Sequence, residues 1–448
     1  MLSLDDARER AASLVKRAQR AGADAADAVY QGDAAESIQI RLGKLEDVER
    51  SEGEHVSLRV FVGQRSASIG TSDLTDAALD ELAERAVAMA RATPVDTYAG
   101  LAPEELLLQG APPELDLSDP GEPSPETLRE MAEACEDAAR AVAGVTNSEG
   151  GAASSGRGRV ALATSHGFCS GYETTSRSLS ASVVAGSGTR MQRDYAWRRA
   201  RHGADLLSPA EIGELAGRRA VARLDPGRLK SGPMPVVLDP RVGGTIIGHL
   251  VGAMSGLSAA RRSTFLLDRL EETLFDTSVV VADEPHRKRG LRSRPFDGEG
   301  LPTTERNLVE NGRVTGWLMD SAAARQLNLQ PTGHAARGGN GAPSVSASNV
   351  HLAAGTASPA ALMSDIADGV YVSELFGHGV NGVTGDYSRG ASGYRIRNGE
   401  IAEPVAEFTI AGNLLGMFGG LTPADDLEWH RAINVPTFRI DGMTVAGD

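Results

Sequence analysis

The sequence predicts an α+β protein in which two N-terminal domains of helices and antiparallel strands precede a larger, mostly β C-terminal domain. A chain of 448 residues is longer than one hydrophobic core usually serves, so two or three domains are expected. A helix, strands, helix pattern occurs twice before residue 229, and short strand patterns with hairpin turns dominate the rest. We therefore expect domains at residues 1–105, 106–228 and 229–448.

The first domain should begin and end with a helix. Ser3 can cap a helix that keeps its apolar spacing as far as Ala18, and Gly22 can end it. A second helix is expected from about Thr75 to Ala92. Between the two helices, apolar and alternating patterns predict strands at residues 28–30, 37–42, 56–62 and 67–70.

The second domain repeats this plan after an irregular, Pro-, Asp- and Glu-rich connection at residues 93–122. Ser124-Pro125 opens a helix that carries Cys135 on its core stripe, and Ser208-Pro209 opens another. Strands are expected at residues 159–164 and 172–184, and glycines at 150–158 predict a flexible break before them. The repeated plan suggests a weak internal duplication, which sequence identity does not show.

The C-terminal domain follows a linker at residues 226–235, and its main helix is expected at Gly243–Ala260. This uncharged run is rich in glycine and contains His249 and Ser255, so it predicts a buried helix and no membrane span. Asn311-Gly312 and Asn398-Gly399 are two-residue hairpin turns. A short helix is expected at 321–327, and strands at 236–238, 278–282, 307–309, 314–319, 370–372, 394–405 and 408–411.

Composition excludes some classes of function. A net charge of −15 and a pI near 5.2 disfavour a broad nucleic-acid surface, which needs clustered lysine and arginine. A local basic patch, His286–Arg289 with Arg292 and Arg294, is interpreted as a solvated loop. The two cysteines form no CxxC pair and no signal peptide is evident, so we expect a reducing, cytoplasmic location.

The stretch from Ser373 to Asn413 carries the most information. Six glycines fall between Gly377 and Gly393, ahead of the Asn398-Gly399 hairpin turn. Loops held on a rigid scaffold often bind ligands, so we expect peptide- or partner-binding residues here. The candidates are Gly377, His378, Asn381, Thr384, Asp386, Tyr387, Ser388 and Arg389. The alternative is a structural turn in which Asp386 and Arg389 only pair with each other.

Three motifs carry a family resemblance: GVNGVTGDYSRGASGY at 379–394, NGEIAEPVAEFTIAGNL at 398–414 and GKLEDVERSEG at 43–53. They resemble the PmbA/TldE proteins of the TldD/PmbA family of two-subunit bacterial metallopeptidases. The matches bracket nearly the whole chain. The resemblance implies a PmbA/TldE-like subunit that acts on unfolded or leader peptides together with a TldD-like partner.

In the TldD half of that family, zinc is held on an HExxxH helix, where two histidines on one face bind the metal and the glutamate activates water. Here Gly248 and Ala253 stand at the histidine positions and His249 at the glutamate position. No cysteine follows Cys169, although the TldD pattern has one near its C-terminus. We therefore expect no catalytic residue and no metal or other cofactor in this chain, with the zinc in the partner.

Other interpretations stay open at this point. The chain could be a stand-alone peptidase with a rearranged metal site, or a non-enzymatic modulator that binds DNA gyrase or another protein. A homodimer in isolation is also open, whereas nucleic-acid and membrane partners are not expected. No GxSxG, GxxxxGK[ST] or GxGxxG motif in a suitable setting supports a serine hydrolase or a nucleotide-binding protein.

Overall fold

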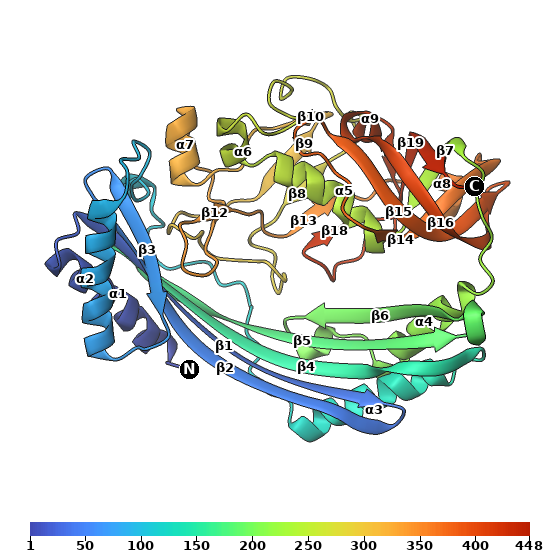
Figure 1. The fold of residues 1–448 in the computed structure, drawn as a ribbon, viewed down its shortest axis with the longest axis horizontal. Helices are drawn as coiled ribbons and strands as arrows, with labels where there is room; N and C mark the ends of the chain where they lie inside the picture. Colours follow the sequence, from blue (N-terminus) through green and yellow to red (C-terminus); the bar gives the residue numbers. More distant parts are fainter.

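The computed structural model describes all residues from Met1 to Asp448 and has two parts (Figure 1). A long, curved antiparallel sheet carries four helices, and a C-terminal part built from a closed barrel and a second sheet lies over its concave face. This confirms the predicted α+β class with a mostly β C-terminal part. None of its helices combines the length and the apolar character that a membrane crossing requires.

The curved sheet has six strands in the order β3-β2-β1-β4-β5-β6. It joins residues on both sides of position 105, because β1 of the first segment pairs along its length with β4 of the second. The strands are β1 Ala25–Arg41, β2 Lys44–Val62, β3 Arg65–Thr71, β4 Val145–Thr164, β5 Cys169–Ala185 and β6 Gln192–Ala200.

Two expectations about this sheet are wrong, and both concern strand length. The strands expected at 28–30 and 37–42 are parts of one strand, β1, which ends at Arg41, and the glycines of 150–158 lie inside β4. A Cβ on Gly151 would lie 2.3 Å from the carbonyl oxygen of Ala132, so glycine here lets helix α3 pack closely on the sheet. The glycines therefore serve packing and do not break the strand.

The helices of this part begin where the sequence predicts. The hydroxyls of Ser3, Thr75, Ser124 and Ser208 accept hydrogen bonds from first-turn amides, and Ser208 forms a full capping box with Glu211. α1 and α2 pack at one end of the sheet, and α3 and α4 cover its outer face at the other (Figure 1). The helices are α1 Leu4–Arg20, α2 Asp76–Ala92, α3 Pro125–Arg140 and α4 Pro209–Ala222, with 3-10 turns at Glu104–Leu106, Gly188–Arg190 and Gly203–Asp205.

The C-terminal barrel follows the order β16-β15-β14-β7-β19-β17, and an extra pairing of β16 with β19 closes it. Its strands are β7 Gly232–Leu238, β14 Asp368–Phe376, β15 Asp386–Arg397, β16 Glu400–Asn413, β17 Leu421–Pro423 and β19 Phe438–Ala446. Asn398 and Gly399 both have positive φ, which confirms the predicted hairpin turn between β15 and β16.

A second sheet, β10-β9-β8-β13-β18, and a small hairpin, β11–β12, complete the fold. Their strands are β8 Val281–Asp283, β9 Arg306–Glu310, β10 Arg313–Val314, β11 Ala335–Ala336, β12 Ser344–Val345, β13 Val350–Leu352 and β18 Ile433–Asn434. The remaining helices are α5 Pro240–Ala253, α6 Gly256–Ala260, α7 Ser321–Leu327, α8 Pro359–Met363 and α9 Leu414–Gly419.

The long helix expected at Gly243–Ala260 is two helices, α5 and α6, interrupted at Met254-Ser255. The chain of Leu318 causes the interruption: its amide donates to the Met254 carbonyl and its own carbonyl accepts from the Gly256 amide, both at 2.8 Å. These bonds use backbone groups that a continuous helix would need. They also explain why the strand expected at 314–319 ends at Val314.

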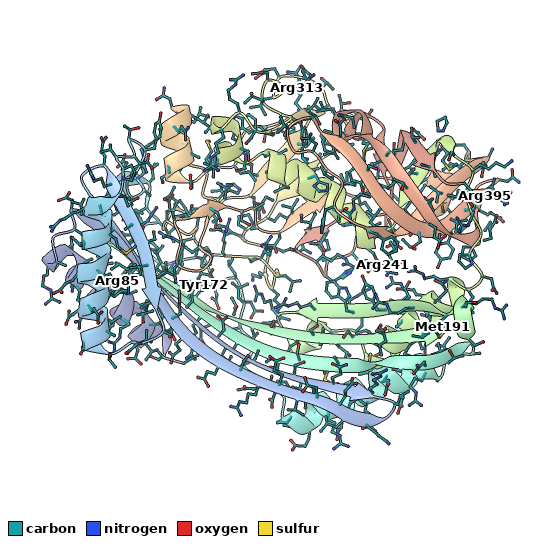
Figure 2. The ribbon with its side chains drawn as sticks, in the orientation of Figure 1. Arg85, Tyr172, Met191, Arg241, Arg313 and Arg395 are labelled. Atoms are coloured by element: carbon teal, nitrogen blue, oxygen red, sulfur yellow. The ribbon has the colours of Figure 1, made fainter.

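Buried ion pairs tie the two parts together. Arg241 of α5 pairs with Asp194 of β6 at 2.8 Å, and Figure 2 shows its side chain between the barrel and the sheet. At the other end, Asp27 of β1 lies 2.7 Å from Arg337, which comes from the C-terminal part. The relative position of the two parts is therefore fixed by charge pairs that are shielded from solvent.

Candidate functional site

The candidate site begins at helix α5, which the sequence places immediately after strand β7. Pro240 cannot continue a central strand and is well suited to the first turn of a helix, while the Asp239 carboxylate caps the Arg241 amide at 2.7 Å. The Tyr371 hydroxyl donates to the same carboxylate at 3.0 Å, which ties α5 to β14. The helix start is thereby held rigidly against the barrel.

The exposed side of the last turns of α5 lines a cavity of about 360 Å³. Its walls combine the metal-helix positions Gly248, His249 and Ala253 with residues of the glycine-rich stretch. The structure thus brings together two groups of residues that the sequence suggested separately. The lining residues are Gly248, His249, Gly252, Ala253, Ser258, Ser263, Phe265, His378, Val380, Gly382 and Arg389.

Three of these, Ser258, Ser263 and Phe265, were missed from the sequence. They follow α5 directly and return to its C-terminal end, where the Phe265 amide donates to the Gly382 carbonyl at 3.0 Å. The sequence signal that could have found them is weak: Ser258 lies near the end of the predicted helix and Ser263 lies just beyond it. A chain that reverses after a helix stays close to that helix's last turn.

The loop within the glycine-rich stretch is shorter than expected, because only Gly377–Gly385 connects β14 to β15. Asp386, Tyr387, Ser388 and Arg389 are already residues of β15. The change from loop to strand follows from pairing: Asp386 to Gly390 lie opposite Asn413 to Thr409 of β16.

Three of the polar candidates, Asn381, Thr384 and Asp386, form hydrogen bonds within the loop or to the neighbouring strand. Asn381 Oδ1 accepts from the Val383 amide at 2.9 Å, and the Thr384 hydroxyl donates to Asp386 Oδ2 at 2.7 Å. Asn413 Nδ2 donates to Asp386 Oδ1 at 3.1 Å, which fastens the loop to β16. These groups fix the shape of the loop.

Tyr387 and Arg389 point from β15 to the same side, since they stand two residues apart. Tyr387 lies in the barrel core with 2% of its surface exposed, so its ring is not available to a bound peptide or partner. Arg389 lines the cavity and donates through Nε to the Phe376 carbonyl at 3.1 Å. Arg389 forms no ion pair with Asp386, which bonds to Thr384 and Asn413 instead, so the pairing expected in the structural alternative is absent.

The remaining candidates lie at or near the cavity with free side chains. His378 lines the cavity and is exposed, as are Gly377 and Ser388, which lie outside the lining. At Gly379, a Cβ would lie 1.9 Å from the Ser388 carbonyl oxygen, so this position needs a glycine for the close approach of the two chains. The close contact holds His378 beside Arg389.

The polar groups around His249 are incompletely satisfied. Its Nε2 atom is buried without a hydrogen-bond partner, and so is the Tyr387 hydroxyl, whose ring meets the imidazole edge to face at 6.2 Å. Burial, aided by the Arg389 guanidinium, lowers the pKa of His249 below its ordinary range. A neutral imidazole can donate one hydrogen bond through one ring nitrogen and accept one through the other.

The cavity residues do not fit a zinc ion. Zinc sites in proteins use three or four thiolate, imidazole or carboxylate ligands, and this cavity offers two imidazoles beside a guanidinium. No group of three or more His, Cys, Asp or Glu side chains able to hold a metal occurs elsewhere in the chain. The arrangement favours hydrogen bonding to a carbonyl or carboxylate group.

Comparison with known proteins gives a consistent assignment across the chain. Family models match three successive stretches: PmbA/TldA metallopeptidase domain 1 at residues 26–90, the central domain at 118–224 and the C-terminal domain at 231–447. The chain is 37% identical to Metalloprotease PmbA of Escherichia coli O157:H7, covering 98% of this chain and 96% of that protein. It is 35% identical to a Metalloprotease PmbA homolog of Haemophilus influenzae, with the same coverage.

Solved structures share the fold. A putative modulator of DNA gyrase from Bacteroides thetaiotaomicron superimposes with a TM-score of 0.92 over 100% of both chains, at 24% identity. TldE from Thermococcus kodakarensis superimposes with a TM-score of 0.87 over 97% of this chain and 99% of that one, at 20% identity.

Proposed function

This chain belongs to the PmbA/TldA metallopeptidase family, and from this premise we propose that it is one subunit of a two-component peptidase. In this proposal a TldD-like partner holds the catalytic zinc, and the joint substrates are unfolded or leader peptides and small proteins. The complex works in the cytoplasm, which suits the two free cysteines of this chain.

The observation that carries the proposal is the cavity between α5 and the Gly377–Gly385 loop. Where a catalytic subunit would present metal ligands, this chain presents His249, His378 and Arg389. A guanidinium gives strong, directional hydrogen bonds to carboxylate and carbonyl oxygens. The cavity is therefore suited to holding a peptide group and not to hydrolysing it.

Within the complex, each cavity residue has a binding role. Arg389 and His378 donate hydrogen bonds to a carbonyl or carboxylate of the substrate or of the partner subunit. His249, kept neutral by burial, lines the same cavity and contacts the bound segment through the exposed part of its ring. The loop, fastened by Asn413, keeps these groups in place without needing to reorganise on binding.

The test uses variants of the complex with its TldD-like partner. We expect Arg389→Gln and His249→Gln to raise KM for an unstructured peptide, or to weaken assembly, by about tenfold, since each removes one charged or buried hydrogen bond. Arg395→Gln is the matched control. Arg395 lies on β15, like Arg389, but it pairs with Asp368 of β14 at the protein surface. Unchanged assembly and kinetics in both cavity variants would contradict the proposal.

One observation favours a second candidate, a peptidase active without a partner. His249 and His378 line one cavity although 129 positions separate them, and two imidazoles are a partial metal-ligand set. Hydrolysis by the purified chain alone that is lost in a His249→Ala/His378→Ala double variant would establish this candidate and overturn the two-subunit proposal.

A further inference from the structure

A second cavity, of about 510 Å³, lies where the end of β6 meets the C-terminal part. Figure 1 shows the chain around β18 descending toward β6 at this place. Three segments form most of its walls: residues 198–201 at the end of β6, residues 287–291 and residues 427–431. Arg287, Lys288 and Arg289 of the basic patch, which the sequence suggested to be a solvated loop, thus form one wall of an open cavity.

The charges of this cavity are strongly unbalanced in a chain whose net charge is −15. Seven lysines and arginines line it: Arg198, Arg199, Arg201, Arg287, Lys288, Arg289 and Arg431. The lining carboxylates are Asp205 and Glu428, which already pair with Arg289 and Arg198. We refer to this site as the cationic cavity.

Four of the cations have no carboxylate partner anywhere in the chain: Arg199, Arg201, Lys288 and Arg431 form no ion pair. Arg199 and Lys288 are exposed at the mouth, whereas Arg201 is held by the carbonyls of Gly290 and Thr175. Arg431 carries a buried Nε with no hydrogen-bond partner. Uncompensated positive charge around a cavity is the complement of an anionic ligand.

Titration directions agree with a positive local potential. Burial and then the neighbouring Arg199 lower the pKa of Arg201 to about 10. Burial, followed by the charges of Arg198 and Arg431, lowers the pKa of His430 to about 3. Both groups lose positive charge more readily mainly because they are buried, and the neighbouring arginines add to this effect.

The aromatic residues at and beside the cavity indicate which class of anion it binds. The Arg287 guanidinium lies 3.2 Å from the centre of the Trp429 ring, and His351 packs against the same ring at 4.7 Å. Arg431 covers Trp197 at 4.7 Å. Since single-stranded nucleic acids bind by stacking bases on free aromatic faces, these covered rings favour carboxylates over nucleobases.

We propose that the cationic cavity binds acidic side chains of the peptide substrate and so gives the complex a preference for glutamate- or aspartate-rich segments. This inference rests on the proposed function, because it names the class of peptide that the complex selects. Guanidinium groups held in place by carbonyl and aromatic contacts lose little freedom when they bind a carboxylate.

The test measures peptide binding to this chain alone, without a partner, so that its failure is separate from a failure of the two-subunit proposal. Fluorescence anisotropy compares labelled hexaglutamate and hexaglutamine peptides at ~0.1 M NaCl, where charges more than about 10 Å apart are largely screened. We expect hexaglutamate to bind at least about tenfold more tightly, with an affinity that falls as salt rises.

The decisive variant is Arg199→Glu/Lys288→Glu, because both residues are exposed, unpaired and at the cavity mouth. It should weaken hexaglutamate binding by about tenfold or more. The matched control, Lys44→Glu/Arg85→Glu, makes the same change of charge at exposed, unpaired positions elsewhere, and Figure 2 shows Arg85 on α2, at the end of the molecule. It should change the affinity less than about twofold.

Three outcomes would overturn the proposal. Equal binding of the two peptides would show that the cavity does not select acidic side chains. Equal losses in the cavity and control variants would show that only net charge matters. A thymidine oligonucleotide of matched charge that bound more tightly than hexaglutamate and depended on Arg199 and Lys288 would make the cavity a nucleic-acid site.

Discussion

Arg241 in the first turn of α5 and Asp194 of β6 form a buried ion pair, with 2.8 Å between Nη2 and Oδ1. Burial alone would raise the pKa of Asp194, but the Arg241 guanidinium holds it below its ordinary range. The pair connects the helix that lines the His249 cavity to the strand whose end lines the cationic cavity. Both candidate binding sites therefore depend on one rigid contact.

Replacing Arg241 by alanine should destabilise the protein by about 3 kcal/mol, since it leaves the Asp194 carboxylate buried with only the more distant Arg223 at 3.4 Å. Urea unfolding measures this change. Arg395→Ala is the control: its partner Asp368 is half exposed, so the loss should stay below about 1 kcal/mol. Equal effects of the two substitutions would show that the Arg241 pair does not hold the parts together.

The Tyr387 side chain should act through packing. Tyr387→Ala should cost about 3–5 kcal/mol, because the ring fills the barrel core. Tyr387→Phe should change stability by less than about 1 kcal/mol, because the hydroxyl that it removes is buried without a partner. A large loss in the phenylalanine variant would mean that the hydroxyl is hydrogen-bonded in solution.

Asp297 should make stability depend on pH. Burial, followed by the nearby Glu299 charge, raises its pKa from 3.8 to about 7. A folded-state pKa above the unfolded value favours the protonated form, so this contribution to stability is complete below pH 3.8 and is lost as the pH rises to about 7. Because of Asp297, the melting temperature should therefore fall as the pH rises from 5 to about 7, and this decrease should stop at higher pH.

An Asp297→Asn variant, which cannot ionise, provides the control for that pH dependence. Its melting temperature should change less than that of the unchanged chain between pH 5 and about 7. Parallel curves for the two proteins would show that another group is responsible.

The isolated chain should retain no stoichiometric zinc. The motivation is the replacement of the metal-helix ligands by Gly248, His249 and Ala253, together with the guanidinium in the same cavity. Elemental analysis after dialysis against a chelator measures it directly. About one zinc per chain that survives this treatment would contradict the prediction.

Local signals in the sequence predicted the helix starts and the hairpin turns. Ser124 and Ser208 each precede a proline, and Asn398-Gly399 fits only a tight turn, so a few residues determine the outcome. The length of the strands was harder to predict, because the glycine at position 151 is explained by the close packing of α3 on the sheet, which the local sequence pattern does not show.

Prediction of the site from the sequence is limited in the same way, because it depends on how separate segments pack. His249 and Arg389 were each singled out, but that they line one cavity follows from how α5 lies against β15 in the barrel. The burial of Tyr387 depends on the same packing, since a tyrosine that alternates with polar residues in sequence can face either side of a strand. Residues 287–291 became a cavity wall only through their contact with β6 and residues 427–431.

In the proposed complex, this chain binds peptide while a partner subunit cleaves it. The most direct measurement is the cleavage rate of one unstructured peptide by this chain alone, by a TldD-like partner alone and by an equimolar mixture. We expect no cleavage by this chain and a rate for the mixture that exceeds the sum of the separate rates. Cleavage by this chain alone at the rate of the mixture would contradict this expectation.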